Sequence, residues 1–117
     1  MTGFGAISIG QLRAVMASPL GVDVYVGDQR RRGLLAKEER QVDDGSGFAV
    51  SAFVTELTVV AVDCPGIKVD SRLSIGPQRA EWAPLPSRDE CTEYVVHRVG
   101  RPDDVGAQTL VLAEANR

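Results

Sequence analysis

The sequence has few of the residues from which most catalytic and metal sites are made. It contains one histidine and two cysteines among 117 residues. His97 lies between Val96 and Arg98 in an extended run, where a lone histidine is most often structural. Cys64 and Cys91 have neither the spacing of metal ligands nor the pattern of a disulfide framework, so we expect two small buried thiols. Because no nucleophile motif is present either, we predict no catalytic residue, no metal and no cofactor.

Aromatic residues, basic charge and long hydrophobic runs are also scarce. Aromatics make up 5% of the chain, and 13 basic against 16 acidic residues give a net charge of −3. Single-strand nucleic-acid binders use aromatic platforms in a basic groove, so this composition argues against that class. No apolar run could span a bilayer, and the start, MTGFGAIS, lacks the features of a signal peptide. We therefore expect one domain over 1–117, made in a cytosol, with no membrane partner.

A helix start signal is present near the N-terminus. Ser8 and Gln11 have the spacing of a capping box, and Ile7 and Leu12 fit the hydrophobic staple that often accompanies it. Pro19 follows the last apolar residue of this stretch and ends the helix. The pattern predicts a helix over 8–18, which must dock on the rest of the domain because so short a helix is not stable alone.

Alternation of apolar and polar residues predicts β-structure for most of the remaining chain. The clearest case is 66–76, GIKVDSRLSIG, which reads as one half-buried strand. Further strands are expected at 22–26, 34–36, 48–62, 93–99 and 108–113. Within 48–62 the buried parity changes near Glu56, which is typical of a bulge or a bend. The sequence thus predicts a mainly β fold: a small antiparallel barrel or sandwich of about six strands, with one short helix and long loops.

Three segments between these elements are candidates for function. The exposed acidic loop 40–47 is either an ordinary connection or the lining of a channel, where carboxylates repel a passing polyanion. The proline-rich excursion 76–91 holds the only tryptophan, Trp82, which either covers the edge of the core or, with Leu85, forms an interface. Three consecutive arginines are expected in a turn at 27–33. These residues are Arg30, Arg31 and Arg32. Either they are solvated in a hairpin turn, or they contact DNA phosphates or an acidic patch on a neighbouring subunit.

The order of strands and turns resembles the head–tail joining proteins of tailed bacteriophages, the stopper or head-completion proteins of the lambda-like head–tail attachment family. The resemblance runs from about Val22 to Leu112 and is carried by structural motifs. These are the turn DCP at 63–65, the strand RLSIG at 72–76, the strand YVVHRV at 94–99, and PDD at 102–104 with a glycine before LVL at 110–112.

The resemblance implies a structural, non-enzymatic virion protein of the phage neck. In that family a small β-barrel assembles, typically six copies to a ring, beneath the portal and its adaptor. The ring retains the genomic DNA in the head without sequence-specific binding and receives the tail terminator or tail-tube proteins. Assembly takes place in the host cytoplasm. In the resembled family an extended loop of the barrel reaches toward the channel. The segment of this sequence that matches it by position is 40–47, so the candidate gate residues are Gln41, Val42, Asp43, Asp44, Gly45 and Ser46.

Two other assignments stay open. One is a tail terminator or tail-tube-like ring protein of related fold, which has different partners. The other is an unrelated small β-barrel that acts as a binding module. The connection at 76–91 is longer than the tight turn usual in the resembled family, so its role is expected to be particular to this protein.

Overall fold

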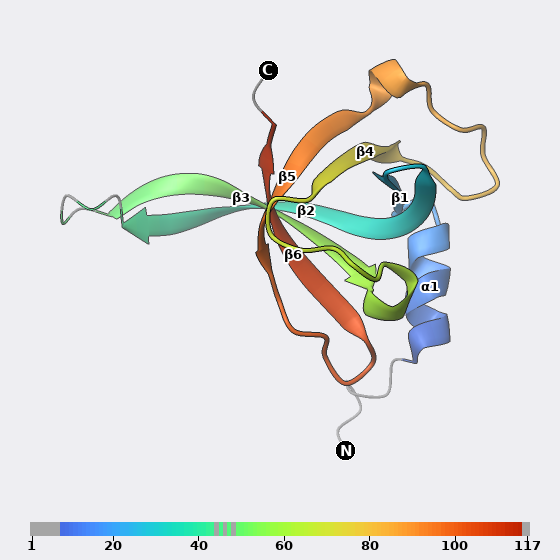
Figure 1. Cartoon of the computed structure of the whole chain (residues 1–117), viewed down its shortest axis with the longest axis horizontal. Helices are drawn as coiled ribbons and strands as arrows, with labels where there is room; N and C mark the ends of the chain where they lie inside the picture. Colours follow the sequence, from blue (N-terminus) through green and yellow to red (C-terminus); the bar gives the residue numbers. More distant parts are fainter. Residues whose placement is uncertain (1–7, 44, 46, 48, 116–117) are drawn as a thin grey trace.

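The computed structural model describes residues 8–43, 45, 47 and 49–115. Within them the chain forms one α-helix, six strands and two short 3-10 helices (Figure 1). The elements are α1 (Ile9–Ala17), β1 (Val22–Val26), β2 (Gln29–Asp43), β3 (Ala49–Val60), η2 (Ala61–Asp63), β4 (Arg72–Gln78), η3 (Arg88–Glu90), β5 (Thr92–Val99) and β6 (Ala107–Glu114). The prediction of a mainly β domain with one short helix is confirmed.

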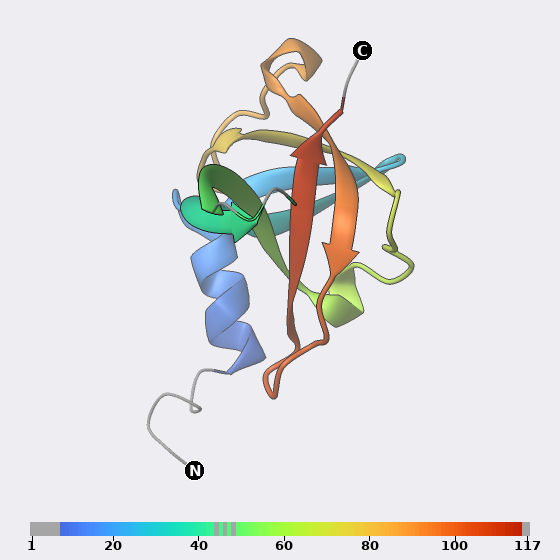
Figure 2. The same ribbon diagram turned by 90° about the vertical axis from the view of Figure 1, so that its left-hand side faces the viewer.

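The six strands close into an antiparallel barrel in the order β1-β2-β3-β6-β5-β4 (Figure 2). Closure follows from β1, which pairs with β2 on one side and with β4 on the other. Side chains of alternating positions fill the interior, as the pleat of a strand requires. The buried core consists of Val22, Val24, Leu57, Val59, Cys64, Leu73, Ile75, Tyr94, Val96, Leu110 and Leu112. The fold is therefore a barrel and not a two-sheet sandwich.

Helix α1 starts at the predicted cap and packs beside the barrel. The Ser8 N–H donates to Gln11 Oε1 at 2.8 Å, and the Gln11 N–H donates to Ser8 Oγ at 3.1 Å. Met16 is the buried residue of the helix, at 2% exposure. Among the residues described, no helix has the length and apolar character needed to cross a membrane.

The prediction of a solvated turn containing the three arginines is wrong. The turn is confined to Gly27 and Asp28, since Gly27 adopts φ 60° and reverses the chain at once. Arg30, Arg31 and Arg32 lie inside β2, paired in register with residues 25, 24 and 23 of β1. Their place on the barrel wall therefore sets what these arginines can contact.

Of the bulge or bend predicted near Glu56 in the third strand, the bulge is wrong. The register of β2 against β3 runs without a shift from the pair of 43 and 49 to the pair of 34 and 58. Residues 55–58 of β3 pair with both β2 and β6 and residues 59 and 60 pair with β6, whereas residues 49–54 pair with β2 alone. The change of parity near Glu56 marks the point where the strand leaves the barrel wall.

The hairpin of β2 and β3 extends beyond the barrel as a projecting arm. We define the arm as residues 38–43 of β2 paired with residues 49–54 of β3. At about 3.3 Å per residue, six paired residues reach roughly 20 Å past the barrel. Figure 1 shows the arm pointing away from α1. The predicted loop 40–47 is thus shorter than expected, because β2 continues to Asp43.

The long strand predicted at 66–76 begins later than its alternation suggested. Residues 66–71 form turns, and Asp70 has φ 73°, a left-handed conformation that a strand does not contain. Val69 is accordingly 51% exposed, although Ile67 packs against the core. The strand β4 starts at Arg72 and continues to Gln78, so the proline-rich excursion starts at residue 79 and not at 76.

Shortening the arm is expected to leave the barrel folded. Replacing residues 40–52 with an Asn-Gly turn removes only pairs that have no partner in the barrel, so the free energy of unfolding should change by less than about 1 kcal/mol. Urea denaturation measures this change. The control Leu57→Ala empties a fully buried core position and should cost about 2–5 kcal/mol. A cost as large as the control's would show that the arm supports the barrel.

Candidate functional site

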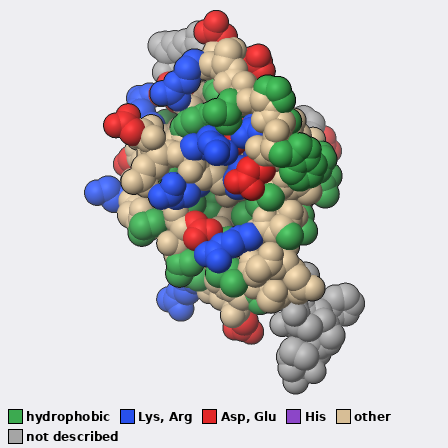
Figure 3. All heavy atoms as spheres, turned by 90° about the vertical axis from the view of Figure 1, so that its right-hand side faces the viewer, with side chains coloured by type: hydrophobic (Ala, Val, Ile, Leu, Met, Phe, Trp, Pro, Cys, Tyr) green, Lys and Arg blue, Asp and Glu red, His purple; other side chains and the backbone are tan. Residues whose placement is uncertain are grey.

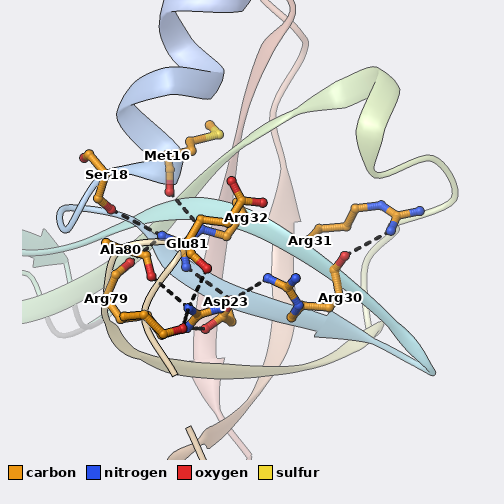
Figure 4. A network of polar contacts seen from close by, with 10 residues as sticks. Met16, Ser18, Asp23, Arg30, Arg31, Arg32, Arg79, Ala80 and Glu81 are labelled. Atoms are coloured by element: carbon orange, nitrogen blue, oxygen red, sulfur yellow. Dashed lines mark hydrogen bonds and ion pairs between the residues drawn. The ribbon is translucent and has the colours of Figure 1, made fainter. Parts of the chain in front are cut away.

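The outer face of β1 is covered by the segment that follows β4. Val22 and Val24 are core residues, so Asp23 and Tyr25, at the alternate positions, face outward. A residue on the outside of a barrel is normally solvated, yet Asp23 is 0% exposed. Arg79, together with Arg30 and Arg32 of β2, lies against its carboxylate (Figure 4). We call residues 79–91, which begin with Arg79, the outer segment.

Asp23 accepts hydrogen bonds from three arginine side chains. Arg79 donates from Nε to Oδ2 at 2.5 Å and from Nη2 to Oδ1 at 2.8 Å. Arg30 and Arg32 donate from Nη1 to Oδ1 at 3.0 and 3.2 Å (Figure 4). Burial alone would raise the pKa of Asp23, but the three guanidinium groups outweigh burial and hold the pKa below its ordinary value. The carboxylate is therefore ionised at neutral pH.

Two of these arginines also bind backbone carbonyls of neighbouring segments. Arg79 Nη1 donates to the carbonyls of residues 80, 81 and 83 at 2.7, 3.0 and 2.7 Å. Arg32 donates from Nε to the Met16 carbonyl at 2.9 Å and from Nη2 to the Ser18 carbonyl at 3.3 Å. The last carbonyls of a helix lack partners within it, and Arg32 supplies them here. One buried carboxylate thus joins the end of α1, the barrel wall and the outer segment.

Close backbone contacts complete this junction. The Glu81 N–H donates to the Ala17 carbonyl at 2.8 Å, and the Arg79 N–H donates to the Gly21 carbonyl at 3.0 Å. A Cβ at Gly21 would lie 1.7 Å from the Met16 carbonyl oxygen, so only glycine permits this approach. The outer segment therefore runs directly beside the end of α1.

A pocket of about 270 Å³ opens between α1, β2, η2 and the outer segment. Its lining consists of Arg13, Met16, Ala17, Arg30, Arg31, Arg32, Asp63 and Glu81. Arg13 forms a two-point ion pair with Asp63 at 2.9 and 2.7 Å, and Arg31 Nε donates to the Asp63 carbonyl at 2.6 Å. We call this cavity the arginine pocket. Figure 3 shows its side of the molecule, with basic and acidic side chains set among hydrophobic ones.

Large hydrophobic side chains remain exposed beside the arginine pocket. Trp82 follows Glu81 in the outer segment and is 79% exposed; Leu85 and Leu20 are 58% and 61% exposed. The residues predicted as interface candidates, the three arginines with Trp82 and Leu85, are thus carried by two segments that Asp23 ties together. The sequence analysis missed Asp23, Arg79 and Arg13. The sequence contains one signal for Asp23. It lies in VDVYV, and a short turn separates this strand from the three arginines, so a hairpin brings them together.

The gate candidates that the structure describes lie at the far end of the arm and just beyond it. Gln41, Val42 and Asp43 belong to β2 and not to a loop, and Gly45 is exposed. Asp44 and Ser46 lie outside the described residues. No described contact joins this end of the arm to the arginine pocket, so the two sets of predicted site residues belong to separate regions.

The candidates for chemistry stay dispersed. His97 is exposed at the point where the register of β5 and β6 shifts. Both cysteines are free; Cys64 is buried and Cys91 half-buried, and burial raises the pKa of each thiol. A thiol with a raised pKa is a poor nucleophile at neutral pH. In the described part of the chain, histidine, cysteine and acidic residues form no group of three suited to a metal ion.

The sequence matches none of the models of known protein families and none of the curated proteins with which it was compared.

Removing the Asp23 carboxylate is expected to destabilise the protein strongly. Asp23→Ala leaves three arginines without their shared partner, and losing one member of a buried ion pair costs about 3–5 kcal/mol. Urea denaturation measures the loss. The control Asp63→Ala breaks an exposed pair with Arg13 and should change stability little. Equal small effects of both substitutions would contradict a central role for Asp23.

The stability that Asp23 contributes should depend on pH. Its pKa is lowered in the folded protein, so its contribution is complete above the ordinary aspartate pKa of about 3.9 and disappears as pH falls through the lowered value. The difference in unfolding free energy between the wild type and Asp23→Asn should therefore shrink below about pH 4. Urea midpoints measured from pH 7 to pH 2.5 test this expectation, and a difference that stays constant would contradict it.

Proposed function

We propose that this chain is a structural, non-enzymatic protein of a tailed-phage neck. In this proposal it forms a ring, of six copies by the resemblance, that joins the portal and adaptor of the DNA-filled head to the tail. It acts in the virion after assembly in the host cytoplasm. The proposal rests on the sequence resemblance together with one structural observation, the arm.

The arm supports the proposal because, in the described part of the chain, its two strands pair only with each other. The barrel pairs β1 with strands on both sides, but residues 49–54 of β3 have β2 as their one described partner strand. A two-stranded ribbon of this kind is marginally stable in water by itself. An arm of roughly 20 Å is therefore suited to being completed by another molecule or to reaching into a channel.

The opposite side of the molecule supports a second contact. The arginine pocket and α1 lie on the side away from the arm (Figures 1 and 3). Tryptophan and arginine are enriched among the residues that contribute most to protein interfaces. A ring needs two different contact surfaces on each copy, and the arm side and the pocket side provide two.

The partners of the chain test this proposal. The purified protein should bind the portal and adaptor proteins encoded beside it, and electron microscopy of the complex should show a ring below the portal. Binding to tail proteins alone would favour a tail terminator. DNA binding at micromolar protein that weakens with salt would favour a nucleic-acid-binding barrel and contradict the neck assignment.

The arm variants test retention of the genome. Particles made with the arm shortened at residues 40–52 should package DNA and then release it, measured as loss of nuclease-protected DNA. The variant with Asp43→Asn and Asp44→Asn keeps the length of the arm and removes its two carboxylates. It therefore shows whether the arm retains DNA by blocking the channel or by repelling the phosphates. Full retention by the shortened arm would remove the gate assignment.

A further inference from the structure

Among the residues that the structure describes, the arginine pocket carries more positive than negative charge. Five arginines lie in or against it, and three carboxylates accompany them. The arginines are Arg13, Arg30, Arg31, Arg32 and Arg79, and the carboxylates are Asp23, Asp63 and Glu81. Two positive charges are therefore in excess at a partly enclosed site, in a chain whose net charge is −3. Guanidinium groups in such a site favour a carboxylate or another planar anion.

The opposite charge gathers at another place on the same molecule. Asp89 and Glu90 are exposed on η3, which the cation–π contact of Arg88 with Tyr25, 5.2 Å from guanidinium to ring centre, holds to the barrel. Beside η3 a groove of about 280 Å³ is lined by further acidic residues, Glu93 of β5 and Glu114 of β6. We call η3 and this groove the acidic end.

The acidic end and the α1 and η2 side of the arginine pocket lie apart in a single copy. In Figures 1 and 2, η3 lies at the top of the molecule, whereas α1 and η2, which contribute to the arginine pocket, lie low in both views. The contact of Arg88 with Tyr25 keeps η3 in its place. A contact between the acidic end and an arginine pocket must therefore join two copies, and two different surfaces in contact generate a ring or a filament.

We propose that the arginine pocket binds η3 of a neighbouring copy of this chain, with the carboxylates of Asp89 and Glu90 as its ligands. This inference rests on the proposed ring and identifies its contact between subunits. Arg13, which is exposed and paired with Asp63, and the partly exposed Arg31 line the α1 and η2 side of the pocket, and in this proposal their remaining N–H groups receive the carboxylates. The exposed ring of Trp82 supplies apolar area at the rim of the contact.

The lining of the pocket favours a protein ligand over nucleic acid. Asp63 and Glu81 lie among its arginines, and Met16 and Ala17 provide apolar surface. The phosphates of a nucleic acid repeat along its backbone, so some of them would lie against the carboxylates of Asp63 and Glu81. A short acidic turn carries only two carboxylates, and both can lie against arginines. DNA is therefore the competing ligand that the experiment must exclude.

Charge reversal in matched pairs tests the proposal. One variant carries Arg13→Glu and Arg31→Glu, and the other carries Asp89→Arg and Glu90→Arg. Sedimentation equilibrium of the full chain up to millimolar concentration should show that each variant alone associates at least about tenfold more weakly than the wild type, because charge-assisted hydrogen bonds are replaced by repulsion between like charges. An equimolar mixture of the two variants should recover the association, because every contact in it restores opposite charges.

A control pair separates this contact from general charge effects. Arg101→Glu and Asp104→Arg are exposed changes in the connection between β5 and β6, and neither should alter association. A wild type that stays monomeric at every concentration, or variants that associate as well as the wild type, would overturn the inference. Binding of a DNA duplex that the Arg13 and Arg31 changes abolish would also overturn it. The neck assignment is judged separately, by binding to the portal.

Discussion

The structure depends on one buried carboxylate shared by three arginines. Asp23 stands on the outside of the barrel wall, where a charged residue would ordinarily be solvated, and it is fully covered. Burying a charge is costly unless it is paired and hydrogen-bonded, and Asp23 accepts four hydrogen bonds from guanidinium groups. Arg79 also donates hydrogen bonds to carbonyls of the outer segment, and Arg32 donates to carbonyls at the end of α1. The cluster therefore connects the surface segments to the barrel wall.

That arrangement explains how a small barrel acquires a specific surface. Its interior is an ordinary set of aliphatic side chains, and its strands satisfy one another's backbone groups. The features available for recognition are additions to the outside: α1, the outer segment and the arm. Two of them are attached through Asp23, while the arm is a continuation of two strands of the wall. Charge is therefore distributed unevenly on a chain whose overall balance is mildly acidic.

The elements that follow local rules could be predicted from the sequence. The capping box located α1 to the residue, and strict alternation located β1, β5 and β6 to within a residue or two. Alternation failed at 66–71, because a left-handed Asp70 reverses the chain without disturbing the pattern of apolar residues. It also suggested a bulge near Glu56, where the cause was the end of pairing with β6, which is a tertiary property. The pairing of Asp23 with Arg30 and Arg32 had a local signal in the hairpin, but the part of Arg79 could not be predicted, since it lies 56 positions away and approaches only through the tertiary fold.

Hydrogen–deuterium exchange on the wild type and Asp23→Ala tests most directly whether Asp23 fastens the recognition surface to the barrel. The amides of Arg79 and Glu81 donate to carbonyls at the end of α1 and just beyond it, and they report on that attachment. The account predicts that in Asp23→Ala the outer segment and the end of α1 lose more protection than the amides of β5 and β6, which lose only what the lower global stability takes from them. Unchanged protection of Arg79 and Glu81 in the variant, or an equal loss of protection across the whole barrel, would contradict it.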